Sequence, residues 1–159
     1  MNTLLLAIIL NPPPPSPSAK CCSGVSYSAD LCPICGLDVL KDTPDLDNNV
    51  VLSRGDKKTA YRCVLCAIAD AKTDSRDVVI ETPSEKKGKW VKILRTAGKW
   101  TVQPETAQFA YIKGSHSQCE IRYRALTKKA AFEAYVATKP KLLANAKLIP
   151  LDEMVKRSE

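Results

Sequence analysis

The sequence contains no apolar run that is long enough to cross a lipid bilayer. Its first apolar run, residues 3–10, has eight residues, whereas a membrane-spanning helix needs roughly 20. Asn11 and a proline-rich stretch at residues 12–17 follow it. We therefore expect no transmembrane span, and we interpret residues 1–20 as either a signal-like segment or a Pro-rich flexible spacer.

The sequence also lacks a partner for every cysteine, because the number of cysteines is odd. Seven are present, so a complete set of intramolecular disulfides is impossible and the spacing of the cysteines favours metal ligation. Cys21 and Cys22 follow the apolar segment, as the lipidated cysteine of a lipoprotein does, although Lys20 stands where lipidation favours a small residue. Export to the cell envelope and a cytoplasmic location both remain open.

Little in the sequence supports catalysis. There is a single histidine, His116, and no general base is recognisable beside an open metal position, which catalytic zinc requires. A nucleophilic pair made of His116 and Cys119 would lack a third, orienting group. We therefore expect that the chain is not an enzyme.

Two C-x-x-C pairs are the strongest signal in the sequence. Cys32 and Cys35 form the first pair, and 27 residues separate it from Cys63 and Cys66. Four soft thiolates match the tetrahedral sulfur preference of Zn²⁺, and such a site is closed to water. We predict a structural zinc site. Use of Cys32 and Cys35 as a redox dithiol is the weaker alternative, because the βαβ context of that motif is absent.

The residues around the two pairs predict how the ligands are positioned. Pro33 and Gly36 favour a tight turn, or knuckle, at the first pair. Residues 50–52 and 59–62 flank a glycine-containing turn and predict a β-hairpin. Residues 63–72 predict a helix whose first turn carries the second pair, where free amides favour thiolates. Knuckle, hairpin and helix in this order are typical of a treble-clef finger, which we place at residues 21–75.

The second half, residues 76–159, has the pattern of a small α+β region packed on the finger. Residues 128–137 form a helical pattern with an apolar stripe that ends before Pro140. Short alternating runs precede it, and we expect an antiparallel sheet with one packed helix. The runs are residues 78–80, 90–94, 100–102, 109–112 and 120–124.

The second half is also strongly basic. Between Ser84 and Lys147 there are 14 Lys or Arg residues and four Glu, and the whole chain has a net charge of +7 and a pI near 9.1. A basic surface of this kind suits an anionic partner. The alternative function is therefore an interaction module that binds nucleic acid or another anionic partner through its second half.

A second metal site is suggested by His116 and Cys119. An imidazole and a thiol three residues apart can share a soft ion such as Cu⁺, with Cys21 or Cys22 as a further ligand. The competing interpretation is a surface histidine and a half-buried cysteine without a ligand.

The order of these features resembles two known groups. Cys32-Pro33-Ile34-Cys35-Gly36 resembles the opening of heavy-metal-binding treble-clef modules, including the YHS type. The later sequence is similar to the NosL-like family, the accessory copper chaperones of nitrous oxide reductase. The matching segments are Trp100, Thr106-Ala107, Phe109-Ala110-Tyr111, Ala130-Ala131-Phe132 and Leu151-Asp152-Glu153-Met154.

The NosL-like resemblance implies an envelope protein, commonly a lipoprotein, that binds Cu⁺ and delivers it to a recipient protein. His116 and Cys119 fall where that family keeps a His/Met metal pair. Leu37 stands where the motif has methionine, and the pair Cys63 and Cys66 is not a hallmark of the family. We predict a metal-binding accessory protein with one structural Zn²⁺ and a second, Cu⁺ site, acting as a metal chaperone or sensor.

Overall fold

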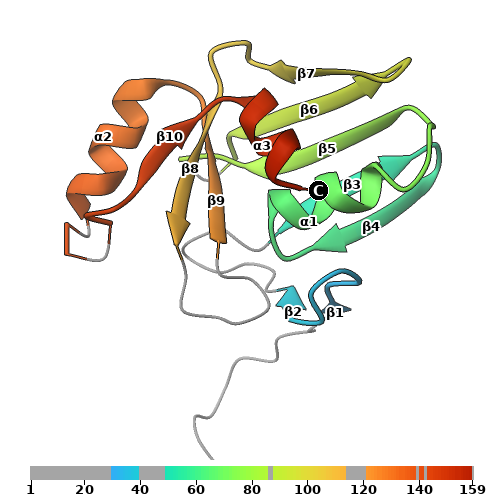
Figure 1. Cartoon of the computed structure of the whole chain (residues 1–159), viewed down its shortest axis with the longest axis horizontal. Coiled ribbons are helices and arrows are strands. Elements are labelled where there is room, and N and C mark those ends of the chain that lie inside the picture. Colours follow the sequence, from blue (N-terminus) through green and yellow to red (C-terminus); the bar gives the residue numbers. More distant parts are fainter. Residues whose placement is uncertain are drawn as a thin grey trace, which may run out of the picture.

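The computed structural model describes residues 30–39, 49–85, 88–113, 121–138, 140–141 and 143–158. This part of the chain contains two antiparallel sheets, a short two-stranded ribbon and three helices (Figure 1). The predicted α+β class is therefore confirmed. None of the described helices is both long enough and apolar enough to span a membrane.

The larger sheet has five antiparallel strands. Their spatial order is β4 (Lys57–Tyr61), β3 (Val50–Arg54), β5 (Val78–Pro83), β6 (Trp90–Thr96) and β7 (Lys99–Gln103). Alternate residues of these strands point to one buried face, as the period of two in the sequence predicts. Val50, Leu52, Ile80, Val91 and Ile93 are among the most deeply buried of them.

The smaller sheet has three antiparallel strands in the order β10 (Lys147–Ile149), β8 (Gln108–Lys113) and β9 (Ile121–Leu126). Helix α2 (Lys129–Thr138) packs on this sheet through Ala131, which lies with Ala110 and Leu126 in a small second core. The predicted helix at residues 128–137 is thus present, shifted by one residue.

Two helices cover the buried face of the five-stranded sheet. Helix α1 (Val64–Ala71) and helix α3 (Leu151–Arg157) lie side by side in front of it (Figure 1). Ala67, Ile68 and Met154 are fully buried between the helices and the sheets. Besides the one packed helix that the sequence analysis expected, the described part of the second half contains the short helix α3, whose N-cap residue is Pro150.

The five-stranded sheet takes strands from both regions that the sequence analysis had separated at residue 75. Strand β3 pairs with β4 on one side and with β5 on the other, with Leu52 opposite Ile80. An isolated hairpin is marginally stable in water and gains stability when further strands extend it. The hairpin between the two cysteine pairs is therefore part of the main sheet.

Candidate metal centre

The first cysteine pair lies in a tight turn between β1 (Asp30–Leu31) and β2 (Asp38–Val39). The Gly36 amide donates to the Cys32 carbonyl oxygen over 2.9 Å, and the Cys32 amide donates to the Leu37 carbonyl oxygen over 2.9 Å. Gly36 has φ +69°, which only glycine adopts at low cost. The turn therefore keeps the sulfur atoms of Cys32 and Cys35 within 4.8 Å of each other.

The second pair lies at the beginning of α1. Cys63 is the N-cap residue, with extended φ −152° and ψ 166°, and Cys66 lies in the first helical turn. No side chain caps this end of the helix. The amides of the first helical turn and the positive end of the helix dipole therefore lie near the sulfur atoms, where they favour thiolates.

The β3–β4 hairpin separates the two cysteine pairs in the sequence, and the fold brings the two pairs together in space. The sulfur atoms of Cys32, Cys35 and Cys66 all lie within 4.8 Å of one another. The Cys63 sulfur is not in this group of three, but it lies 3.5 Å from the Cys66 sulfur. All four cysteines are reduced and buried.

These separations are compatible with one shared ion. Zinc–sulfur bonds of roughly 2.3 Å at tetrahedral angles place two ligand sulfurs roughly 3.8 Å apart. The 3.5 Å between the Cys63 and Cys66 sulfurs is near that value, and the sulfurs of Cys32, Cys35 and Cys66 lie within 4.8 Å of one another, whereas the Cys63 sulfur lies outside that group of three. The donor set therefore fits a thiophilic metal ion.

The two thiols of the knuckle differ in acidity. Burial raises the pKa of Cys32, but backbone hydrogen bonds from Arg62, Cys35 and Ile34 outweigh it and hold the pKa below its usual value. Burial raises the pKa of Cys35, and the neighbouring Cys32 thiolate raises it further. Of these two thiols, Cys32 therefore loses its proton more readily, because backbone amides stabilise its thiolate.

Arg62 connects the knuckle to the hairpin. Its backbone amide is one of the donors to the Cys32 sulfur, and its side-chain Nη1 donates to the Asp38 carbonyl oxygen over 2.8 Å. Asp38 belongs to β2, which closes the knuckle. Because Arg62 directly precedes Cys63, these two contacts link the segment of the second cysteine pair to the knuckle.

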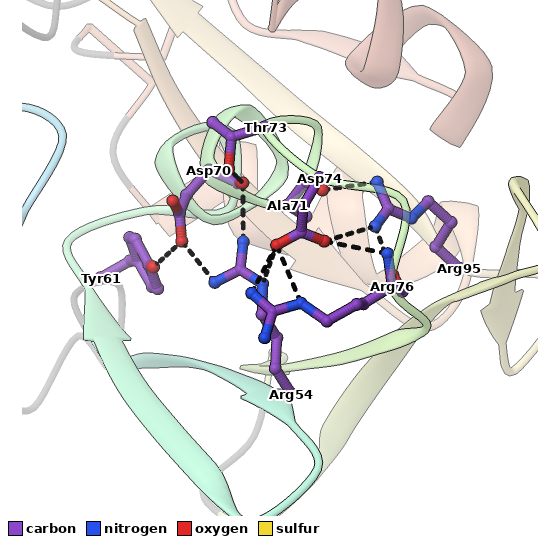
Figure 2. A network of polar contacts seen from close by, with 8 residues as sticks. All are labelled: Arg54, Tyr61, Asp70, Ala71, Thr73, Asp74, Arg76 and Arg95. Atoms are coloured by element: carbon purple, nitrogen blue, oxygen red, sulfur yellow. Dashed lines mark hydrogen bonds and ion pairs between the residues drawn. The ribbon is translucent and has the colours of Figure 1, made fainter.

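The other end of α1 is held by a network of charged side chains (Figure 2). Arg54 of β3 donates from Nη1 to the Asp70 carboxylate over 2.8 Å and from Nη2 to the Asp70 carbonyl oxygen over 2.7 Å. The Tyr61 hydroxyl donates to the same carboxylate. Asp70 lies on α1, one helical turn after Cys66, so these bonds fix the direction in which the helix presents its cysteine.

The network shifts the pKa of its members in opposite directions. Burial raises the pKa of Asp70, but the hydrogen bonds from Arg54 and Tyr61 outweigh it and keep the pKa below its usual value. Burial and the Asp70 carboxylate together raise the pKa of Tyr61 to about 12. Asp70 is therefore ionised and Tyr61 is protonated at neutral pH.

Arg95 of β6 completes the network from the opposite side. It is buried, and its guanidinium donates to the backbone oxygens of Ala71 and Arg76 and lies 3.4 Å from an Asp74 oxygen. Positive charge at the carboxyl end of a helix is favourable because unpaired carbonyls gather there. Both ends of α1 are thus anchored, one by the cysteines and one by the two arginines.

The sequence analysis did not identify Arg54, Tyr61, Asp70 and Arg95 as residues that position the site. Arg54 and Asp70 are separated by 16 residues, and Arg95 and Ala71 by 24. No local pattern marks such pairs. The proposed second-site residues, His116, Cys119, Cys21 and Cys22, all lie outside the described residues.

Comparisons with known proteins show a fold relationship. No family model matches the chain, and curated protein sequences gave no match. Among solved structures, the chain is similar to the crystal structure of the mercury-bound form of MerB2, with a TM-score of 0.56 and 12% sequence identity. The match covers 68% of this chain and 54% of that one, so this chain spans about half its length.

At 12% identity this likeness concerns the fold alone. It shows that MerB2 has a similar fold over the 68% of this chain that the match covers. Membership of the NosL-like family stays a prediction from the sequence.

Proposed function

We propose that this chain is a non-enzymatic, metal-binding accessory protein. Cys32, Cys35, Cys63 and Cys66 would hold one thiophilic ion in a finger of the treble-clef type, and Zn²⁺ is the first candidate for that ion. One observation carries the proposal: three reduced, buried sulfur atoms from two distant segments lie within 4.8 Å of one another. A fourth lies 3.5 Å from one of them.

Several features support a structural role for this ion. Reduced cysteines that cluster in a buried position without forming disulfides are typical of metal ligands. Four thiolates fill a tetrahedral shell and leave no position for water, so the site offers no catalytic centre. The amides aimed at Cys32 supply the charge stabilisation that a four-thiolate shell requires.

We further propose that the chain delivers a soft metal ion to a recipient protein. This part of the proposal rests on the sequence resemblance to the NosL-like family and on His116 and Cys119 as ligands for Cu⁺, with Cys21 or Cys22 as a third. The fold neighbour MerB2 was crystallised with mercury, another thiophilic metal, so Hg²⁺ belongs among the ions to be titrated. The recipient would be a protein with soft ligands of its own.

Elemental analysis of the full chain, purified under reducing conditions without added metal, tests the first site. We expect about one zinc per chain. Replacement of zinc by Co²⁺ should give the visible spectrum of a tetrahedral four-thiolate site. Cys32→Ser, Cys35→Ser and Cys66→Ser should each weaken that spectrum and lower the metal content, while Cys119→Ser should change neither.

A protein that binds no zinc, and that gives no thiolate-to-cobalt absorption after reduction and loading, would contradict the proposal. Titration of the zinc-loaded protein with Cu⁺ then tests the second site. We expect one further ion to bind, and His116→Ala and Cys119→Ser to abolish that event. If no further ion binds, the delivery role is wrong while the structural site is unaffected.

The basic second half supports one alternative, the binding of nucleic acid or another polyanion. The charge asymmetry between Ser84 and Lys147 is the observation that favours it. Contacts between Lys or Arg and phosphate release counterions, so the affinity should fall steeply as salt rises. Titration with a fluorescent oligonucleotide at low ionic strength tests this alternative, and an absence of binding there would eliminate it.

A further inference from the structure

The outer edge of strand β7 is the least protected edge of the main sheet. Among the described residues β7 pairs only with β6, and none of its five residues is buried. The other edge of the sheet, β4, begins with Lys57 and Lys58, and charged residues of this kind discourage pairing between edges. The centre of β7 instead reads Trp100-Thr101-Val102.

The turn between β6 and β7 determines which backbone groups face outward. Ala97 and Gly98 form a two-residue hairpin loop with φ +48° and +79°, and Thr96 pairs with Lys99. In such a hairpin the pair that flanks the loop is hydrogen-bonded, and bonded pairs then alternate along the ladder. Lys99, Thr101 and Gln103 therefore direct their backbone groups to β6, whereas Trp100 and Val102 direct theirs to the free edge.

We propose that this edge pairs with the β7 strand of a second copy of the chain, antiparallel and centred on Thr101. In this register Trp100 of each copy lies opposite the partner's Val102, and the two residues exchange both backbone hydrogen bonds. Lys99 lies opposite Gln103, so no like charges meet. The pairing forms one continuous sheet through both copies.

The side chains of β7 suit this register. An aromatic residue opposite a β-branched residue is a favourable cross-strand pair. Trp100 and Val102 are only half-buried, and they line a groove of about 870 Å³ that β7 shares with Leu151 and Val155 of α3. The two-fold axis would run perpendicular to the sheet, so the grooves of both copies open on the same face and the partner's Trp100 and Val102 lie beside them.

Thr101 provides the sharpest test because it lies on the axis. It is exposed, so a charged replacement leaves the core intact. In the proposed register Thr101 lies opposite the partner's Thr101, and these two residues form a pair without backbone hydrogen bonds. The side chains of such a pair lie close together, so two like charges at this position are destabilising. We expect Thr101→Lys and Thr101→Glu each to raise the dimer dissociation constant roughly fivefold or more, and an equimolar mixture of the two to restore association.

The mass of the full chain should be measured by light scattering and sedimentation over a concentration series, with reductant present so that thiols do not cross-link copies. Val102→Pro removes an outward amide without breaking a bond to β6, and we expect it to weaken the dimer. Lys58→Pro is the matched control on the β4 edge, where the equivalent outward position lies, and it should leave the dimer intact.

A wild-type chain that stays monomeric at every concentration overturns the proposal, and β7 would then be open to a strand of another protein. A dimer that is as tight in both Thr101 variants as in the wild type also overturns it, because that dimer uses another surface. Far-ultraviolet circular dichroism of each variant excludes unfolding as the cause of lost association.

Discussion

Arg95 of β6 donates a hydrogen bond from its guanidinium to the backbone oxygen of Ala71, the last residue of the helix that begins at the cysteine site. The same guanidinium reaches the Arg76 carbonyl oxygen and lies 5.5 Å from the centre of the Trp100 ring. A single buried side chain thus holds the carboxyl end of α1, the loop that follows it and the neighbouring strand. We infer that it fixes the helix on the sheet.

Arg95→Met should therefore destabilise the fold strongly. The substitution keeps much of the volume but removes the guanidinium donor from the buried Ala71 carbonyl and from the part-buried Arg76 carbonyl, and we expect a loss of about 2 to 4 kcal/mol in the free energy of unfolding. Urea denaturation followed by circular dichroism measures it. Arg76→Met is the control: its side chain is 69% exposed and pairs with Asp74, so the cost should stay below about 0.5 kcal/mol. Equal losses in both variants would contradict the inference.

Glu85 should make stability depend on pH in the acid range. Burial raises the pKa of Glu85, but hydrogen bonds from the Thr127 hydroxyl and amide, 2.6 and 3.1 Å away, outweigh it and lower the pKa to about 2. Because the folded pKa is below the unfolded one, this stabilisation is complete above about pH 4.5 and is lost as the pH falls toward 2.

The test compares the wild type with Glu85→Gln in urea titrations from about pH 5 to about pH 2. At the upper end we expect the variant to be less stable by about 1 to 3 kcal/mol, because charged hydrogen bonds are lost. The difference should vanish at the lower end. Glu81→Gln, which removes only a partly exposed ion pair with Lys92, should change little across the range. A constant difference would show that Glu85 does not carry the pH dependence.

Metal removal should loosen the knuckle and leave the sheet in place. Helices α1 and α3 cover the apolar face of the main sheet, and Arg54 and Arg95 hold the carboxyl end of α1 independently of the cysteines. We expect a strong chelator to increase hydrogen exchange at the amides of residues 32–37 and 62–66 by at least about tenfold. The amides of β5 and β6 should keep their protection, and global unfolding on chelation would contradict this expectation.

Gly36→Ala should weaken metal binding through the backbone. At φ +69° an added Cβ meets no atom within 4 Å, so the cost is conformational and should be about 1 kcal/mol. Gly88→Ala is a matched control, with φ +79° and equally open space, but it lies far along the chain from the cysteines. Both variants should lose similar stability, and only Gly36→Ala should lower the affinity for Co²⁺ in a chelator competition.

The sequence was sufficient to predict the elements whose side chains follow a regular period. The alternation at residues 90–94 marks β6, and the helix formers after Cys63 mark α1, because local steric preference and burial on one face act together there. The paired spacing of the cysteines likewise indicated that the two segments come together. For each of these features the physical cause lies within a few residues.

The pairing of distant segments could not be predicted from the sequence. The residues around Leu52 do not predict that it will lie opposite Ile80, because the edge of one strand can pair with many others. In the same way, the residues around Asp70 do not predict its bond to Arg54, because a carboxylate can bind many donors. The choice among them is made by how the whole chain buries its apolar faces. For this reason the cysteines of the candidate site could be named from the sequence, whereas the residues that hold α1 in place were found only in the structure.

The pairing of β3 with β5 has a consequence for any attempt to use the cysteine finger by itself. A peptide cut after residue 75 would keep all four thiols of the two pairs, but one edge of β3 would lose its neighbouring strand and would expose unpaired backbone groups to water. Such a fragment would be prone to aggregation. Transplanting the finger into another protein would therefore require the host to supply a replacement for β5.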